Sequence, residues 1–354
     1  MFIRLLKRAT LAARASVVIL ATSLLASSQV AYGQSTSSVL DLQKTVQGIY
    51  LDRKNAVVRV KVATETLSEN NEPKVVLRVF SGFFISEKGQ VLTSYLPTDN
   101  ATRVWIEKGG ISFLADIVGS DARTNVALLQ VINLPDSFDY IKLIEEKESL
   151  EIGALAFSVT SPLDFSPTPK FGLVTGYESH FAEVIFPLTY TRLSISIGPA
   201  EGGSPAFDAD NELIGIVMAT LPEVDSSYIV PSKALARIVS QLTKYQKVRY
   251  GLLPIEFEEK PDNYNIGKRV LVKSIVPGSP AERSGLQPGD EILNLEGSQI
   301  ADLDDLRDSI FFKDPGDFLL FTIKRDQKEL DFAILLEPEE DHIVEGNTVG
   351  SSNN

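Results

Sequence analysis

The stretch Gly198–Phe207, GPAEGGSPAF, is a glycine- and proline-rich turn that stands just before a strand-like run, ELIGIVMA. Short runs of β-branched or alternating apolar residues fill the chain on its N-terminal side, divided by Gly, Asn and Asp. About a dozen such strands without a long helix between them predict an all-β sandwich or barrel rather than a parallel βαβ sheet. Since about 190 residues of this pattern exceed one small barrel, we expect two packed antiparallel β-barrels.

The strand-like runs are short and closely spaced. They are AVVRVKVAT (56–64), KVVLRVFSGFFIS (74–86), GQVLTSY (89–95), TRVWIEKG (102–109), ISFLADIVGSD (111–121), NVALLQVI (125–132), ALAFSVTS (154–161), FGLVTGYES (171–179), LSISI (193–197) and ELIGIVMA (212–219). The first clear helix follows at PSKALARIVSQLTKY (231–245), with apolar residues at helical spacing. This helix closes a β domain that we assign to residues 55–248.

A second unit follows, and we assign it to residues 249–338. It mixes strand-like runs with turns and one clear helix pattern, which predicts an α+β domain. Its segments are YGLLPIEF (250–257), RVLVKSIVPGSPAERSGLQPGDEILNLEGSQI (269–300), DLDDLRDSIF (302–311), FLLFTIKR (318–325) and ELDFAILLEP (329–338). The aspartates of the helix pattern spread over its surface, which favours a solvated face over a calcium site.

The two ends of the chain have compositions of their own. Residues 1–33 combine a basic start, an apolar run and the small-residue site Ala31-Tyr32-Gly33, which is typical of a secretory signal peptide. We predict cleavage near Gly33 and a periplasmic or secreted protein; the alternative is an uncleaved membrane anchor, for which the apolar run is short. Residues 34–54 predict a helical lead, and the acidic, polar residues 339–354 predict a disordered tail.

Composition excludes several classes of function. A formal net charge of −13 opposes a nucleic-acid surface, which needs clustered Lys and Arg. The absence of cysteine excludes disulfides, thiolate metal sites, a cysteine nucleophile and a lipoprotein anchor. Only two histidines, His180 and His342, are present for acid–base or metal chemistry. The sequence implies no cofactor and no metal.

Five segments, taken in order, resemble the HtrA (high-temperature requirement) family. They are SGFFISEKGQVLTSY (81–95), GSDARTNVALLQV (119–131), FGLVTGYES (171–179), YIVPSKALARIVSQLTKY (228–245) and VPGSPAERSGLQPGDEILNLEGSQI (276–300). The resemblance covers roughly Val39 to Pro338 and implies a trypsin-like double β-barrel followed by one PDZ domain. It also implies the place of a serine triad, in which a carboxylate orients the histidine that deprotonates the serine.

All three triad positions differ from the family pattern. Leu96 stands where the family has its histidine, Asn125 where it has its aspartate, and Gly202 where it has its serine. A leucine cannot accept a proton, an amide lacks the charge that stabilises an imidazolium, and a glycine has no hydroxyl. Ser204 is the alternative nucleophile if the alignment slips by two residues, but the sequence offers it no base.

The same resemblance implies an oxyanion hole and a peptide site. The hole would use the N–H groups of Gly202 and Ala200, with Glu201 opposing a developing oxyanion if it pointed inward. The PDZ fold adds a peptide as a strand and holds its carboxylate with loop N–H groups. The residues implied for this site are Gly251, Leu252, Leu253, Pro254, Ile255, Phe257, Leu303, Leu306 and Ile310. Since Pro254 lacks an N–H, binding of internal segments becomes the alternative to binding of a chain terminus.

We therefore hypothesise an exported HtrA-like pseudoprotease that binds unfolded or partner polypeptides, as a chaperone-like holder or a regulatory subunit. The alternative is an active HtrA serine endopeptidase in envelope protein quality control; a tethered structural envelope protein is a third. The resemblance implies a homotrimer and active HtrA relatives as further partners, and no nucleic acid.

Overall fold

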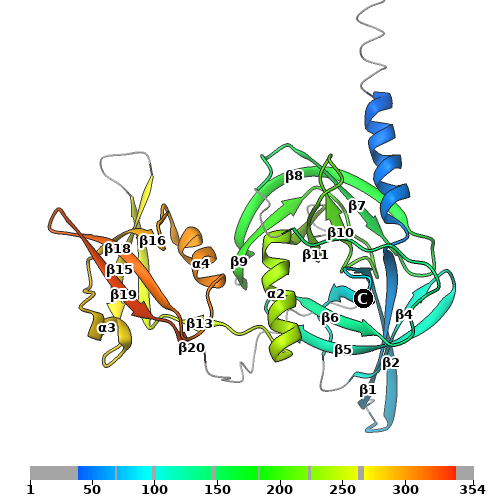
Figure 1. The fold of residues 1–354 in the computed structure, drawn as a ribbon, viewed down its shortest axis with the longest axis horizontal. Coiled ribbons are helices and arrows are strands. Elements are labelled where there is room, and N and C mark those ends of the chain that lie inside the picture. Colours follow the sequence, from blue (N-terminus) through cyan, green and yellow to red (C-terminus); the bar gives the residue numbers. More distant parts are fainter. Residues whose placement is uncertain are drawn as a thin grey trace, which may run out of the picture. The chain divides into compact units, whose positions relative to one another are not determined.

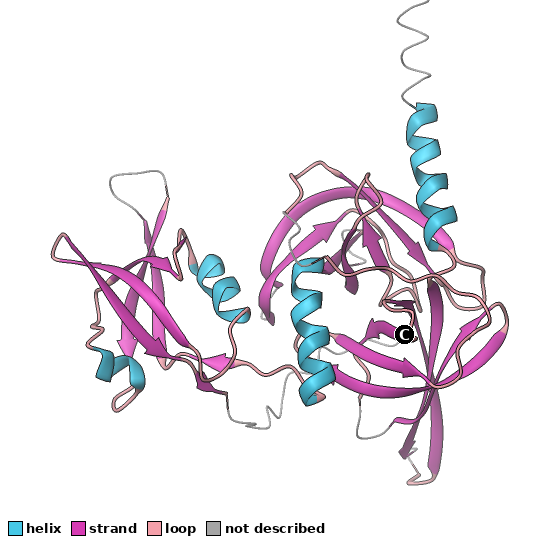
Figure 2. Ribbon diagram, viewed as in Figure 1, coloured by secondary structure: helices cyan, strands magenta, loops and turns pink. Residues whose placement is uncertain are grey.

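The computed structural model describes residues 39–67, 70–97, 101–144, 149–181, 184–221, 225–261 and 267–339. Strands dominate these residues (Figure 2). The predicted signal peptide and nearly all of the predicted tail lie outside them. The predicted helical lead forms a helix over residues 39–53. The chain divides into two compact units, Met1–Asp52 and Arg53–Asn354. Among the described residues, none of the helices has the length and apolar character needed to cross a bilayer.

The first six strands close into an antiparallel barrel in the order β1-β2-β3-β6-β5-β4 (Figure 1). Their bounds are β1 Val57–Leu67, β2 Pro73–Phe84, β3 Gln90–Ser94, β4 Ala101–Lys108, β5 Ile111–Asp121 and β6 Val126–Val131. Alternate residues of β1 point into a core that Leu96 and Phe84 also fill. Closure leaves no exposed sheet edge, which explains why short alternating runs suffice to build the domain.

A second barrel closes in the order β10-β11-β12-β9-β8-β7. Its strands are β7 Leu155–Thr160, β8 Thr168–Phe181, β9 Val184–Leu193, β10 Pro205–Phe207, β11 Leu213–Leu221 and β12 Ser226–Pro231. The predicted strand LSISI was wrong: only Leu193 is in a strand, and residues 194–200 form an irregular loop. Three strands of this barrel, β9, β10 and β12, were missed by the prediction. In β9, Pro187 lacks the N–H of a regular strand and interrupts the pattern.

Helix α2 (Ser232–Tyr245) follows the second barrel, as the sequence predicts. It presents an apolar face of buried side chains that include Leu235, Ile238 and Leu242. Gln246 ends it in the left-handed conformation, with φ 62° and an N–H that donates to the Leu242 carbonyl. The predicted closing helix is therefore confirmed to within one residue.

The C-terminal domain, which follows α2 within the second unit, has a sheet of order β14-β15-β16-β18-β19, with β17 paired to β16, and a separate β13–β20 pair. Its elements are β13 Gly251–Leu252, β14 Ile255–Pro261, β15 Lys268–Ile275, α3 Pro280–Ser284, β16 Glu291–Leu295, β17 Ser298–Gln299, α4 Leu303–Phe311, β18 Phe318–Arg325, β19 Lys328–Leu335 and β20 Glu337–Pro338. One core, which includes Val270, Leu306 and Phe321, joins the sheet to both helices. The mostly β fold of a trypsin-like double barrel followed by a PDZ domain is thus confirmed.

Candidate functional site

The position of the implied histidine is occupied by a core side chain. Leu96 follows β3, is 0% exposed and packs into the apolar core of the first barrel. Its N–H donates to the Ser120 hydroxyl at 3.0 Å, which fixes the backbone of the segment. The position that the resemblance gives to a general base therefore holds a packed hydrocarbon side chain.

Asn125, at the implied aspartate position, lies in the turn between β5 and β6 with φ 57°. Its Nδ2 group donates a short hydrogen bond to the Met218 carbonyl on β11, and its carbonyl accepts from the Tyr95 N–H at 3.0 Å. Tyr95 is the residue before Leu96, so the structure brings these two triad positions side by side. The amide is used for a hydrogen bond that joins the two barrels.

Gly202, at the implied serine position, lies against the same segment. A Cβ atom added there would lie 3.1 Å from the Ser94 hydroxyl, two residues before Leu96. The Gly202 carbonyl accepts from the Ser81 N–H at 2.9 Å. The structure thus brings the neighbourhoods of Leu96, Asn125 and Gly202 together.

Ser204 is not placed as a nucleophile. It is 0% exposed, its hydroxyl donates to the Glu201 carbonyl at 2.6 Å, and its own carbonyl accepts from the Val217 N–H. His180 lies near the β8–β9 turn, opposite Ile185, and its Nδ1 is 3.3 Å from the Ser179 hydroxyl. His342 lies outside the described residues. Ser204 is therefore a turn residue with its hydroxyl already bonded.

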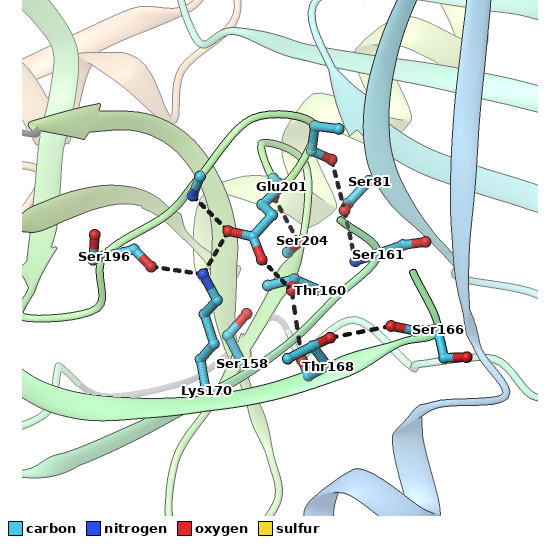
Figure 3. Close-up of polar contacts among 12 residues, drawn as sticks. Ser81, Ser158, Thr160, Ser161, Ser166, Thr168, Lys170, Ser196, Glu201 and Ser204 are labelled. Atoms are coloured by element: carbon cyan, nitrogen blue, oxygen red, sulfur yellow. Dashed lines mark hydrogen bonds and ion pairs between the residues drawn. The ribbon is translucent and has the colours of Figure 1, made fainter. Parts of the chain in front are cut away.

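The Glu201 side chain turns into the second barrel and is held there by several groups (Figure 3). Glu201 is 3% exposed, and its Oε2 lies 2.5 Å from the Lys170 ammonium and 2.5 Å from the Gly198 nitrogen. Its Oε1 accepts from the Thr160 hydroxyl at 2.7 Å, and Lys170 also donates to the Ser196 carbonyl at 2.8 Å. The carboxylate is therefore neutralised and fully bonded rather than directed at an oxyanion site.

The rest of the loop is tied down in the same way. Ala200 has φ 67°, a strained value for a residue with a Cβ, and its carbonyl accepts from the Ser81 hydroxyl at 3.0 Å. The same hydroxyl accepts from the Ser161 N–H at 2.9 Å. Gly203 donates to the Val217 carbonyl at 2.7 Å, in a conformation with φ 86° that brings it too close to the first barrel for any side chain. Both implied oxyanion donors belong to this tied loop.

The C-terminal domain presents an open strand edge beside a helix. β14 is an edge strand, since it pairs with β15 alone, and α4 packs beside it. Side chains from both elements are partly buried against the core and remain accessible: Ile255, Phe257, Leu303 and Ile310. Leu306, by contrast, is 3% exposed and belongs to the core beneath them. An open strand edge beside apolar side chains is the geometry that accepts an extended peptide.

The loop before β14 is only partly suited to a carboxylate. Gly251 and Leu252 pair with Pro338 and Glu337, which engages that part of the loop in a ladder. Leu252 is 48% exposed, whereas Leu253 is 9% exposed. Pro254 is buried, contributes no N–H, and its carbonyl accepts from the Val276 N–H at 3.0 Å.

Two acidic side chains, those of Asp302 and Glu259, cap the N-terminus of α4. Asp302 accepts from the N–H groups of Asp304 and Asp305, and Glu259 on β14 accepts from the Leu303 N–H at 2.9 Å. These bonds satisfy the free N–H groups of the first turn. Within the described residues, no cluster of three or more His, Asp or Glu side chains has the arrangement of a metal site.

Comparisons with known proteins agree with this architecture. Residues 80–216 match the trypsin-like peptidase domain family, and residues 251–336 match the PDZ domain family. The periplasmic pH-dependent serine endoprotease DegQ of Escherichia coli is 27% identical over 269 residues, which cover 73% of this chain and 59% of DegQ. The periplasmic serine endoprotease DegP of Escherichia coli is 25% identical over 281 residues, which cover 76% of this chain and 59% of DegP.

The chain is homologous to the HtrA-type proteases. It spans 59% of the length of DegQ and of DegP. The solved HtrA-type protease AlgW with a tripeptide superimposes with a TM-score of 0.67 at 19% identity, covering 83% of this chain and 97% of AlgW. The serine endoprotease of Yersinia pestis gives a TM-score of 0.57 at 20% identity, covering 83% and 98%. These two structures confirm the fold.

In this HtrA homologue, sequence reasoning missed the groups that hold the Gly202 loop. Lys170 lies 31 positions before Glu201, and Thr160 and Ser81 lie still further away. The available signal was weak: a glutamate inside a Gly-rich turn, and a lysine within the strand TPKFGLV. A charged residue in a turn that enters a buried site needs a partner, but the sequence does not say which lysine provides it.

Proposed function

We propose that this chain is an exported HtrA-like pseudoprotease, which binds unfolded or partner polypeptides without cleaving them. The observation that carries this proposal is the complete burial of Leu96 in the first-barrel core, at the position of the catalytic histidine. With no base at that position, a hydroxyl in the loop cannot be deprotonated, and it therefore cannot attack a peptide carbonyl.

Two further contacts support the loss of catalysis. Asn125 donates to the Met218 carbonyl, so it offers no charge to an imidazolium. Glu201 is bonded to Lys170, so neither is available to activate Ser204, whose hydroxyl faces the Glu201 carbonyl instead. Loss of the whole triad leaves only binding and polarisation by backbone N–H groups.

Polypeptide binding is assigned to the groove between β14 and α4. AlgW has been solved with a tripeptide and with a decapeptide, and it has the same fold as this chain. Here, the free edge of β14 supplies backbone groups, while Ile255, Phe257 and Ile310 supply apolar contacts. Because Pro254 removes an N–H from the loop, we propose that the groove favours internal segments over a free chain terminus.

Location and assembly follow from the relatives. DegQ and DegP are named periplasmic enzymes, and we propose a periplasmic protein released by cleavage near Gly33. N-terminal sequencing of the exported protein should begin at Gln34. A homotrimer, or association with active HtrA relatives in a chaperone-like or regulatory role, is proposed on the same basis, and mass measurement of the native protein tests it.

The rival function is an active serine endopeptidase, which is what the names of the relatives say of those proteins. The test is casein digestion by the purified protein beside its Ser204→Ala variant, with a serine-directed phosphonate as a covalent probe. We expect no digestion and no labelling by either protein, together with saturable binding of unfolded casein. Digestion that Ser204→Ala abolishes would establish the endopeptidase instead.

A further inference from the structure

Strand β18 is apolar on both of its faces. Its sequence FLLFTIKR begins with four consecutive apolar residues. Leu319, Phe321 and Ile323 are 0% exposed and fill the core, while Phe318 is 66% and Leu320 48% exposed on the opposite face. Continuous apolar runs are typical of strands that are covered on both sides. The residues that the structure describes cover only one side of β18 and leave Phe318 and Leu320 exposed on the other.

The neighbouring strand extends this apolar surface. Phe318 lies opposite Leu335 of β19, and Leu320 lies opposite Ala333. Cross-strand partners share one face of a sheet, so these four residues form a single outer surface, which we call the β18–β19 patch. Further along the same face the residues become polar, since the Thr322 hydroxyl donates to the Asp331 carboxylate at 2.8 Å.

The surroundings of the patch carry both signs of charge: the Leu320 N–H donates to Glu296, which pairs with Lys313 at 2.9 Å, and three further carboxylates lie nearby in the sequence. Asp317 precedes Phe318 in the sequence, Asp331 lies two residues before Ala333, and Glu337 lies two residues after Leu335. Among the described residues, none of these three carboxylates forms an ion pair within 4.0 Å. Asp317 and Asp331 do accept hydrogen bonds, from the Asp314 N–H and the Thr322 hydroxyl. Because Asp317 also interacts electrostatically with Arg237, Asp331 and Glu337 are the two carboxylates beside the exposed apolar groups that have no ion pair among the described residues. They complement a partner that carries Lys or Arg.

The patch is separate from the peptide groove. The order of the sheet places β14 at one edge and β19 at the other, with three strands between them. The groove lies beside α4 on the β14 side, whereas the patch lies on β18 and β19. One polypeptide can therefore occupy the groove while another covers the patch.

We propose that the β18–β19 patch is a second docking surface, whose occupant is a cationic amphipathic segment of another protein. Apolar side chains of that segment cover Phe318 and Leu320, and its Lys or Arg side chains pair with the flanking carboxylates. The contact buries exposed aromatic and aliphatic surface at its centre and keeps the charges at its rim.

The experiment measures binding of two fluorescein-labelled 18-residue amphipathic peptides to the whole protein, one made of Leu and Lys and the other of Leu and Glu. The test variant is Phe318→Ser/Leu320→Ser. The matched control is Phe165→Ser/Leu163→Ser, whose side chains are 69% and 46% exposed in the loop between β7 and β8. We expect the Leu/Lys peptide to bind at least about tenfold more weakly to the test variant, and within about twofold of wild type to the control.

A triple variant without the three carboxylate charges separates the electrostatic contribution to peptide binding from the apolar one. Asp317→Asn, Asp331→Asn and Glu337→Gln keep the hydrogen-bond acceptors but remove the charges, so affinity and its salt dependence should both fall. An equal loss of affinity for the Leu/Lys peptide in the Phe318 and Phe165 variants would overturn the proposal, because it would show that the peptide is attracted to the acidic protein as a whole. Equal binding of the Leu/Glu peptide would also overturn it. A native mass that falls to that of a monomer in the Phe318 variant alone would overturn it in favour of a second copy of this chain.

Discussion

Lys170 Nζ lies 2.5 Å from Glu201 Oε2, and Glu201 directly precedes Gly202, where the resemblance implies a nucleophile. The Glu201 side chain is 4% exposed, so this ion pair is largely removed from water. A buried carboxylate that keeps its cation and its hydrogen bonds stabilises a local conformation, whereas one that loses its cation is costly. This ion pair therefore holds the Gly202 loop in one conformation, and it does so without a bound substrate.

Removing the ammonium should destabilise the second barrel. We expect Lys170→Met to lower the free energy of unfolding by about 3 kcal/mol, because Glu201 is left buried without its cation. Urea denaturation measures this value. Lys273→Met is the matched control, since Lys273 pairs with Glu256 at the surface and should change stability little. An unfolding curve of Lys170→Met that overlays the wild-type curve would show that the pair does not fix the loop.

Restoring the hydroxyl alone should not restore proteolysis. Gly202→Ser places a Cβ 3.1 Å from the Ser94 hydroxyl, which can rotate away, so the variant should fold. Leu96 and Asn125 still provide no base and no charge, and we expect casein to remain intact. The control is the wild-type protein under the same conditions. Casein cleavage by Gly202→Ser would refute our account of the missing base.

Replacing Leu96 by histidine should weaken the first barrel. Leu96 is 0% exposed, so an imidazole would leave an apolar core with an unpaired polar group. We expect Leu96→His to cost about 3 kcal/mol or more in the free energy of unfolding, measured by urea denaturation. Leu96→Met, which conserves volume, should cost clearly less. If the histidine variant were as stable as the methionine variant, the site would be more open than the structure shows.

Glu107 should make stability depend on pH. Its hydrogen bond from Lys61, together with the charges of Arg59 and Lys61, holds the pKa of Glu107 below its ordinary value of 4.5. A lowered pKa in the folded state means that the contribution is present above about pH 4.5 and is lost as the pH falls through the folded-state value. The free energy of unfolding of the wild type should exceed that of Glu107→Gln by about 1–3 kcal/mol at pH 7, and this difference should shrink near pH 3.

Urea denaturation at the two pH values gives the Glu107 comparison. Glu151→Gln, at an exposed position, is the control and should follow wild type at both. A difference between wild type and Glu107→Gln that stays constant down to pH 3 would contradict the assigned partners.

Substitutions at the surface of the peptide groove and in the core beneath it should have different effects. We expect Ile310→Ser to weaken peptide binding several-fold with little loss of stability, because Ile310 is only partly buried beside β14. Leu306→Ala should instead cost about 2–4 kcal/mol in the free energy of unfolding.

Pro254→Gly should raise affinity for a peptide with a free carboxylate relative to its amidated form, measured by titration calorimetry. Equal affinities for the two forms in both proteins would show that the loop does not hold a chain terminus.

Much of the fold could be predicted from local patterns. Alternating runs predicted all six strands of the first barrel and three of the six in the second, and apolar spacing predicted α2 and α4. Strand β9 was missed because Pro187 interrupts its pattern, and LSISI was assigned wrongly because a loop of Ile and Ser shows the same alternation as a strand. Periodicity reports which faces are apolar and does not report whether backbone groups find a ladder.

For the candidate site, too, one part could be predicted from the sequence and another part could not. Resemblance located Leu96, Asn125 and Gly202, and side-chain chemistry alone indicated that these three cannot form a triad. The sequence could not show that Leu96 enters the barrel core or that Leu306 lies beneath the groove, since burial depends on which elements pack over a residue.

Residue types and local spacing were enough to predict the order of the domains, and to find a leucine, an amide and a glycine where the resemblance implies a triad. Tertiary structure alone decided that Lys170 and Thr160 meet Glu201, and that Phe318 and Leu335 share an open face. Strand pairing joins residues far apart in the chain, and closure of a barrel fixes which of them meet. Such contacts have no local pattern, so only the folded chain specifies them.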